Sequence, residues 1–236
     1  MTTSGTANFN LDFSEIAEEA YERCGVELRT GYDLRTARRS MNLLLVEMAN
    51  RGINLWTVEE GAIPLLDAQA TYNLPVDTVD LLDHVVRTGS GANQTDINIS
   101  RISEPTYSTI PNKNATGRPI QIYIQRLSGA TEPSGVAYPK VTVWPTPQGT
   151  SYTLIYWRLR RIQNVNGATN TLDIPFRFLN CMIAGLAFYL SMKIADVNPA
   201  RIPALKGDYI EQLQLAMDED REKAPIRFVP RSMYYG

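Results

Sequence analysis

The sequence contains one histidine, His84, which follows Asp83 in the segment VDLLDHVVRTG. A histidine beside a carboxylate could act as a general base that the acid orients. Such a base needs a nucleophile to activate, and the sequence has no GxSxG or CGxC motif. The residues therefore favour a surface or interface histidine over a catalytic one.

The carboxylates of the β-rich region are poorly spaced for chemistry. Glu59 and Glu60 are adjacent, so on a strand they point to opposite faces and could not flank one glycosidic bond. Asp77, Asp80 and Asp83 recur every three residues, but the glycine and the terminal glutamate of an EF-hand loop are missing. These patterns predict neither a cell-wall hydrolase nor a calcium site.

The common motifs for nucleotide and metal binding are also missing from the sequence. The glycine-rich GSGAN near Gly89 follows no βαβ pattern, and no Walker-type GKS or GKT occurs. Cys24 and Cys181 are too few and too far apart for a zinc site or a disulfide framework, so we expect two buried, reduced thiols. We expect no catalytic residue, no cofactor and no metal.

Three arginines in YWRLRRI, namely Arg158, Arg160 and Arg161, are the first candidates for a partner interface. On a strand, Arg158 and Arg160 project from one face, opposite the face of Trp157. Neighbouring like charges on a strand are unfavourable unless a counter-charge is found. Two interpretations stay equally open: contact with phosphate or an acidic partner surface, or exposure to solvent.

The last residues, IRFVPRSMYYG, are the second candidate interface. They combine aromatic side chains with arginines, the residue types that anchor protein interfaces. A free terminus has little need of so many apolar and aromatic residues. We therefore expect residues 225–236 to be an assembly arm, with these contact residues: Arg227, Phe228, Arg231, Tyr234 and Tyr235.

Composition narrows the class of partner. The chain has 236 residues, of which 44% are hydrophobic and 20% charged, with a formal net charge of −2 and a pI near 5.6. A protein that grips nucleic acid by neutralising phosphates usually has a basic excess, and this chain has none. The polar start MTTSGTANFN lacks the basic and apolar regions of a signal peptide, so we do not expect it to act as one. The longest apolar run, residues 178–195, contains too many polar residues for a membrane span, so we expect no membrane contact.

Helical and strand patterns follow one another along the chain. Residues 1–11 are expected to be a flexible N-terminus, and residues 12–55 hold two amphipathic helices. The first helix has Asp12 and Glu15 in a capping box and Gly25 at its end. Residues 56–173 alternate in polarity over short segments such as IQIYIQ and KVTVW, with weaker strands expected at DINIS and TYSTI. Residues 174–224 return to the helical period in two further helices.

This order predicts an α+β fold. Each helix pair alone leaves an apolar stripe exposed, so the two N-terminal and two C-terminal helices should pack into a four-helix bundle. Residues 56–173 then form an inserted all-β sandwich or barrel-like domain. The extended C-terminal arm follows Pro225, which cannot continue a helix.

Three segments resemble the head-to-tail adaptor (connector) proteins of short-tailed bacteriophages, of the tail tubular protein A type. The short helix of AEEAYERCGVE and the long helix of RTARRSMNLLLVEMANRGINLW are similar to the opening of these adaptors. The hairpin KVTVWPTPQGTSYTLIYWRLRRI and the proline-initiated helix DIPFRFLNCMIAGLAFYLSMKI are similar to their later elements, in the same order. The resemblance spans most of the chain but leaves out residues 89–117.

The resemblance implies a non-enzymatic structural protein of the virion, made in the host cytoplasm and placed at the head–tail junction. It implies a homo-oligomeric, dodecameric ring beneath the portal protein, with tail nozzle or tail fibre proteins as further partners. DNA would pass through the ring during genome ejection without sequence-specific binding, which a mildly acidic protein suits. The alternative is a receptor- or carbohydrate-binding tail component that uses exposed aromatic side chains of the β region.

Overall fold

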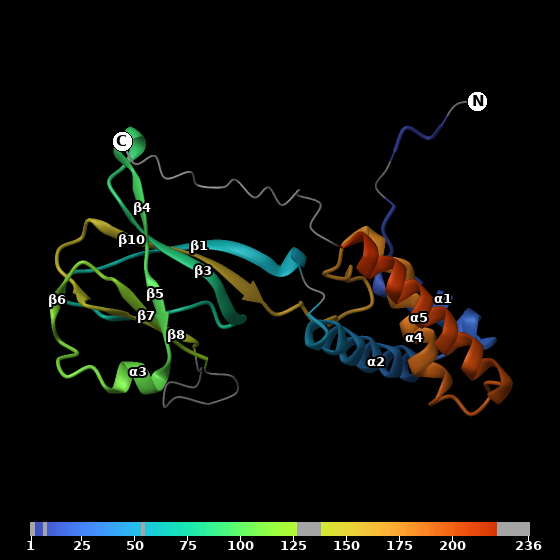
Figure 1. Ribbon diagram of the computed structural model, residues 1–236. Helices are drawn as coiled ribbons and strands as arrows, with labels where there is room; N and C mark the ends of the chain where they lie inside the picture. Colours follow the sequence, from blue (N-terminus) through green and yellow to red (C-terminus); the bar gives the residue numbers. More distant parts are fainter. Residues whose placement is uncertain (1–2, 7–8, 53–54, 127–137, 221–236) are drawn as a thin grey trace, which may run out of the picture. The chain divides into compact units, whose positions relative to one another are not determined.

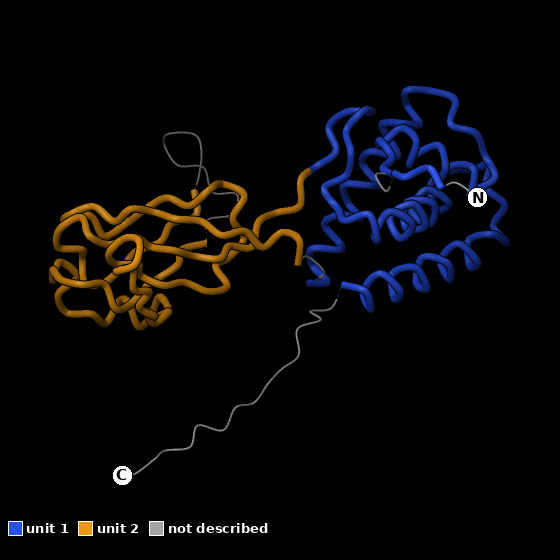
Figure 2. The backbone as a smooth tube through the Cα atoms, turned by 90° about the horizontal axis from the view of Figure 1, so that it is seen from above, with its two compact units in different colours: residues 1–53, 164–236 blue, residues 54–163 orange. Residues whose placement is uncertain are grey.

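The computed structural model describes residues 3–6, 9–52, 55–126 and 138–220 (Figure 1). The backbone divides into two compact units, residues 1–53 with 164–236, and residues 54–163 (Figure 2). Within the described ranges, the first unit holds four of the five α-helices, and the second holds the two large sheets. The predicted α+β class is confirmed.

Helix α1 (Phe13–Cys24) begins and ends where its local sequence predicts. The Asp12 carboxylate accepts a hydrogen bond from the Glu15 amide, and the Glu15 carboxylate accepts one from the Asp12 amide, so the predicted capping box is present. Gly25 follows with φ 80°, a left-handed conformation that glycine adopts without strain. One face of the helix is buried: Phe13, Ile16, Ala17, Ala20, Tyr21 and Cys24.

Helix α2 (Gly31–Asn50) starts with a second capping box, formed by Thr30 and Asp33. Its buried face is also one stripe of the helix: Ala37, Ser40, Met41, Leu44, Leu45 and Met48. Because only this stripe is buried, the opposite side of α2 remains exposed.

Helix α4 (Leu179–Ser191) follows the 3-10 helix η3 (Phe176–Phe178) and contacts α1, α2 and α5 (Ile202–Glu219). It is apolar and buried on nearly all sides, as its sequence predicts. A Cβ at Gly185 would lie 2.8 Å from Leu44 Cδ2 and 3.0 Å from Tyr209 Cε2, so a glycine here lets α2 and α5 approach α4 closely. Neither α4 nor any other helix among the described residues combines the length and apolarity needed to cross a membrane.

Residues 164–173 cluster with the helices, although their sequence placed them at the end of the β region. Val165 is buried, and its backbone exchanges hydrogen bonds of 2.9 and 3.1 Å with the side-chain amide of Asn42 on α2. The Phe13 amide donates to the Asn170 carbonyl at 2.9 Å. These contacts join residues more than a hundred positions apart, which a local sequence pattern does not reveal.

The second unit contains two four-stranded sheets. The first runs in the order β1 (Val58–Pro64), β10 (Tyr152–Arg160), β3 (Thr78–Thr88) and β4 (Thr95–Asn98), with every pair antiparallel. The second runs β2 (Thr71–Asn73), β8 (Lys140–Trp144), β7 (Gln121–Gln125) and β5 (Ser100–Ile102), with β5 parallel to β7. Two short strands, β6 (Thr116–Gly117) and β9 (Thr146–Pro147), pair in parallel and form a third, two-stranded sheet.

Side chains from both large sheets form one hydrophobic core, which includes the alternating Ile122 and Ile124 of β7 and the following residues: Leu65, Tyr72, Leu74, Leu81, Val86, Ile99, Val141, Val143, Leu154 and Tyr156. The strands expected at DINIS are present as β4 and the start of β5. The strand expected at TYSTI is wrong, because that segment overlaps the short helix α3 (Glu104–Ser108). Ser103 caps this helix by accepting a hydrogen bond from the Thr106 amide, and Pro105 occupies its first turn.

Candidate functional site

Arg158 and Arg160 lie in an ion-pair cluster with two acidic residues of the second unit. Glu59 on β1 is directly opposite Arg158 in the strand register. Arg158 Nη2 is 2.8 Å from Glu59 Oε2, and Arg158 Nη1 is 2.5 Å from Asp77 Oδ1. Arg160 Nε is 2.6 Å from the other carboxylate oxygen, Glu59 Oε1. One carboxylate therefore bridges two guanidinium groups, and Asp77 supplies a second negative charge.

Both arginine side chains are largely withdrawn from solvent, with exposed fractions of 12% for Arg158 and 11% for Arg160. Leu154, Tyr156, Arg158 and Arg160 are every second residue of β10, so their side chains lie on the same face of the strand. Leu154 and Tyr156 place this face against the hydrophobic core. The interpretation that these arginines face solvent is therefore wrong. The counter-charges come from the same chain, and a contact with an outside partner stays a prediction.

The cluster holds its acidic members in the ionised form. A hydrogen bond from Arg160 outweighs burial and, with Arg158, holds the pKa of Glu59 below its ordinary value. Burial disfavours ionised Asp77, yet hydrogen bonds and charge from Arg158 still lower the Asp77 pKa. The four charges are thus fixed at neutral pH and serve to tie β1 and β10 to the residues that precede β3.

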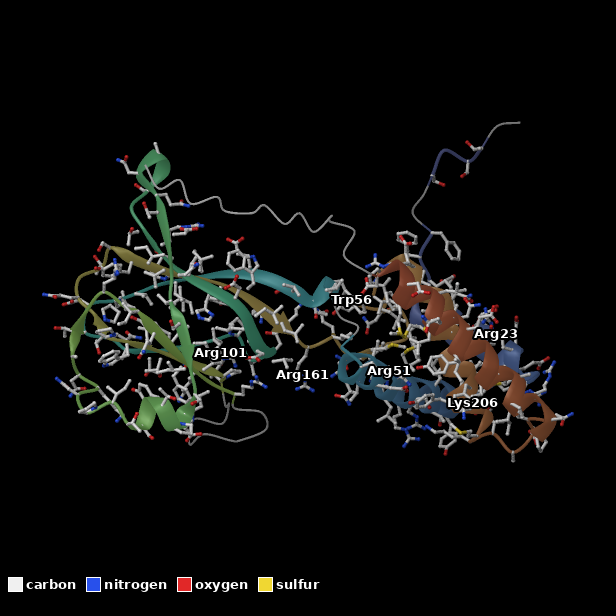
Figure 3. All side chains as sticks on the ribbon, in the orientation of Figure 1. Arg23, Arg51, Trp56, Arg101, Arg161 and Lys206 are labelled. Carbon is white, nitrogen blue, oxygen red and sulfur yellow. The ribbon has the colours of Figure 1, made fainter. Side chains whose placement is uncertain are left out.

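Arg161 differs from its two neighbours. Its backbone amide donates to the Asp77 carbonyl at 2.8 Å, while its side chain is exposed beyond the end of β10 (Figure 3). Within the described ranges, no acidic side chain pairs with its guanidinium. Of the three predicted arginines, Arg161 is the one whose charge is open to a partner. The other predicted contact residues lie outside the described part of the chain: Arg227, Phe228, Arg231, Tyr234 and Tyr235.

His84 is buried, which corrects the expectation of a surface or interface histidine. Only 7% of the residue is exposed, and neither ring nitrogen has a hydrogen-bond partner in the described structure. Asp83 accepts a hydrogen bond from the His84 backbone amide at 2.8 Å, so this carboxylate does not orient the imidazole ring. Burial lowers the pKa of His84 and keeps the ring neutral in the folded protein. This pair is not arranged as an acid–base dyad.

The structure contains a polar cluster beside β5 and β7 that the sequence did not predict. Asp80 pairs with Arg101 at 2.9 Å and also with Arg126. Arg101, Arg126 and Tyr123 line a hollow of about 690 Å³. The Tyr123 ring stacks on Tyr107 with centroids 5.1 Å apart. These residues come from distant parts of the chain, so their spacing gave no signal. No group of three metal-ligating side chains occurs among the residues that the structure describes.

A second hollow, of about 690 Å³, lies beside α1 in the first unit. Two of its aromatic side chains are strongly exposed, Phe9 at 75% and Phe176 at 80%. We name it the acidic groove, and its lining is Phe9, Leu11, Glu15, Glu18, Glu19, Glu22, Phe176, Leu179, Asn180 and Ile183. The glutamates recur at helical spacing in the sequence, but the aromatic walls come from separate segments.

The four glutamates of the acidic groove are not equivalent. Glu15 is held by the capping box of α1, and Glu19 pairs with Arg23 at 2.9 Å. Glu18 and Glu22 have no basic partner within the described residues. These two carboxylates are therefore available to an outside cation.

The exposed side of α2 has the opposite charge. Six residues at helical spacing form what we name the basic stripe: Tyr32, Arg35, Arg39, Leu43, Val46 and Asn50. The Arg35 guanidinium lies 6.0 Å from the centroid of the Tyr32 ring. Among the described residues, neither Arg35 nor Arg39 has an acidic partner. Leu43 and Val46 are 56% and 49% exposed, so two exposed apolar side chains follow the arginines along the stripe.

The described surface therefore offers charged and apolar patches for protein contacts. The histidine of the chain, His84, is buried and has no catalytic partner among the described residues. A search among curated protein sequences finds no match. The family model for the SU10 adaptor protein matches residues 12–229, a range that begins at the cap of α1 and includes every helix and strand described above. With nearly the whole sequence matched, the chain belongs to the SU10 adaptor protein family, whose members are structural phage adaptors.

Proposed function

We propose that the chain is a non-enzymatic, ring-forming adaptor that joins the portal of the phage head to the tail and surrounds the DNA channel. The match to an adaptor family through both units carries this proposal. An adaptor is a virion component that contacts portal and tail proteins in general. The resemblance of the sequence to tail tubular proteins favours a dodecameric ring at the head–tail junction, made in the host cytoplasm and open to DNA during genome ejection.

Each unit has a role in this proposal. The packing of α1, α2 and α5 around α4 supports a four-helix bundle as the body of the subunit, into which the β region is inserted. The exposed Arg161 is the contact residue that we propose for the β region, and it follows the half-buried Arg160, whose Nη1 donates to the Arg161 carbonyl at 3.2 Å. Residues 225–236 are the proposed arm toward the portal.

The test uses DNA-filled heads that lack this protein. The purified chain should form rings when imaged by electron microscopy, and these rings should bind such heads at the portal vertex only. Heads that already carry the protein are the control and should bind none. Failure of the chain to bind the deficient heads would contradict the adaptor function.

The second candidate function is carbohydrate binding by the β region, and the Tyr107–Tyr123 pair favours it. Aromatic side chains together with a few convergent polar or charged groups are the usual lining of a small-ligand site, and a sugar is one such ligand. Tyr123, Arg101 and Arg126 line one hollow, and Asp80 holds both arginines in place. A glycan array with the intact chain and with Tyr123→Ala separates the two functions. Binding that the substitution removes supports a receptor-binding tail component, and no binding rejects it.

A further inference from the structure

We propose that the acidic groove of one copy receives the basic stripe of a second copy. The proposal rests on the ring-forming adaptor function above and names the surfaces through which neighbouring subunits meet. Both surfaces belong to the first unit, which we call the helical unit, and they share no residue. One subunit can therefore offer its groove to one neighbour and its stripe to the other.

The unpaired charges of the two surfaces match in number and in spacing, and they are opposite in sign. Glu18 and Glu22 lie four residues apart on α1, and Arg35 and Arg39 lie four residues apart on α2. Side chains at this spacing are neighbours on a helix, and like charges there repel one another. Each pair is thus unfavourable in the isolated subunit. When the two surfaces meet, the glutamates and the arginines neutralise each other.

Exposed apolar groups flank the charges on both surfaces. Phe9 and Phe176 stand at the acidic groove, and Leu43 and Val46 continue the basic stripe. Apolar side chains of this size become the desolvated centre of an interface when a partner covers them. Charge then fixes the orientation of the contact, while apolar burial supplies most of its strength.

Shape also favours the contact. A hollow of about 520 Å³ borders the basic stripe and is lined by Tyr32, Arg39 and Leu43, among others. This hollow has room for an aromatic side chain such as Phe176, which projects from the groove with 80% exposure. Two different patches that complement one another make a heterologous contact, and repetition of such a contact generates rings when the rotation closes.

The test reverses the charges of one surface at a time. The variants are Glu18→Arg with Glu22→Arg, and Arg35→Glu with Arg39→Glu, compared by sedimentation velocity at low salt. Each variant should weaken self-association about tenfold or more, because each creates a surface that repels its partner. The native association should also weaken as salt rises, since screening acts on exposed charges. Glu27→Arg with Glu211→Arg is the matched control, because both glutamates are exposed and lie outside the acidic groove, and it should leave association unchanged.

A mixture of the two reversed variants gives the decisive result. One variant has two basic surfaces and the other has two acidic surfaces, so an equimolar mixture should regain association in alternating order. Rings that form normally from each reversed variant alone would overturn this interface and leave the adaptor function standing. A native chain that neither forms rings nor binds deficient heads would overturn the adaptor function itself.

Crosslinking identifies what occupies the groove. A photoreactive phenylalanine analogue at Phe176 should crosslink to the α2 peptide that contains Arg35 and Arg39 in assembled rings. The residues 226–236 also carry arginines and aromatic side chains, so they are the rival occupant. A crosslink to that segment, or to a head or tail protein, would overturn the proposal.

Discussion

Gly61 on β1 lies directly opposite Tyr156 on β10, and the tyrosine ring fills the space that a side chain at Gly61 would need. A Cβ at this position would come within 2.4 Å of Tyr156 Cζ. Tyr156 is only 4% exposed and belongs to the hydrophobic core of the second unit, residues 54–163, which we call the β unit. The glycine is therefore required by a close approach between neighbouring strands.

Gly61→Ala should lower the free energy of unfolding of the β unit by about 1–3 kcal/mol, because the added methyl displaces a packed ring. All three tryptophans, Trp56, Trp144 and Trp157, lie in this unit, so fluorescence-detected urea unfolding measures the effect. Gly207→Ala on α5 is the control, since nothing lies within 4 Å of its Cβ position. Because Gly207 belongs to the other unit, that change should leave the fluorescence-detected transition of the β unit unchanged.

How much the sequence could predict depended on how far apart the interacting residues lie. The capping box of Asp12 and Glu15 spans three residues, so the start of α1 was predictable from a local pattern. The acidic partners of Arg158 lie 81 and 99 residues away. Strand alternation placed Arg158 and Arg160 on one face correctly, but only the strand order shows that this face leads into the core.

Long sequence separation also explains why the sequence predicted neither the burial of His84 nor the acidic groove. His84 is buried because β3 lies between β10 and β4, a sheet order that no local pattern gives. The acidic groove needs Phe9 and Phe176, which the fold brings to α1 from segments far apart. Helix periodicity showed the glutamates on one side of α1, but it gave no information about the aromatic walls.

Leu186→Ala should destabilise the helical unit by about 2–5 kcal/mol, because the removed atoms leave a cavity in a packed helix interface. Leu186 is fully buried on α4. Circular dichroism at 222 nm during urea unfolding reports mainly on the helices. Leu215→Ala on α5 is the matched control, since Leu215 is 57% exposed and the same substitution should change little. Equal effects of the two substitutions would show that α4 is not central.

Arg158→Ala should destabilise the β unit, whereas Arg161→Ala should leave its stability within about 0.5 kcal/mol of the native value. The first change leaves Asp77 without its arginine and Glu59 with only one, at a site where the Arg158 side chain is 12% exposed. We expect a loss of about 1–3 kcal/mol in fluorescence-detected unfolding. A loss of head binding in Arg161→Ala, with stability unchanged, would support Arg161 as a contact residue.

The β unit should lose stability as the pH falls below the ordinary His84 pKa of 6.5. Burial lowers the His84 pKa in the folded state, with a smaller opposing effect from Asp83 and a smaller reinforcing effect from Arg101. Above pH 6.5 His84 is neutral in both the folded and the unfolded chain, so its protonation does not reduce the free energy of unfolding. Between pH 6.5 and the lowered pKa only the unfolded chain binds the proton, so stability declines by at most about 1.4 kcal/mol per pH unit.

His84→Leu should flatten this slope in unfolding experiments between pH 7.5 and 5.5. Carboxylates with lowered pKa values, such as Glu59 and Asp77, lose their contribution to stability only at pH values below this window. They therefore do not affect the slope measured between pH 7.5 and 5.5. An unchanged slope in the variant would show that His84 is not the titrating group.

Truncation after Pro225 tests the proposed assembly arm. Helix α5 ends at Glu219, and the next residue, Asp220, is almost fully buried and accepts a hydrogen bond from Arg177 Nε at 3.1 Å. The truncated chain keeps this contact and all other described contacts, so its melting temperature should change by less than about 2 °C. It loses Arg227, Arg231 and the three aromatic residues of the segment, which are the groups suited to an acidic partner surface. Attachment to portal-containing heads should therefore be lost.

The measurement is co-sedimentation of truncated and intact protein with DNA-filled heads that lack this component. Sedimentation velocity of the truncated chain alone is the control, because a defect in ring formation would also prevent attachment. Intact rings that no longer bind heads assign residues 226–236 to the portal contact. Equal co-sedimentation of the two proteins would reject the arm. A truncated chain that cannot fold would instead place the segment in the core of the helical unit, where its apolar side chains would be buried against residues of the same chain.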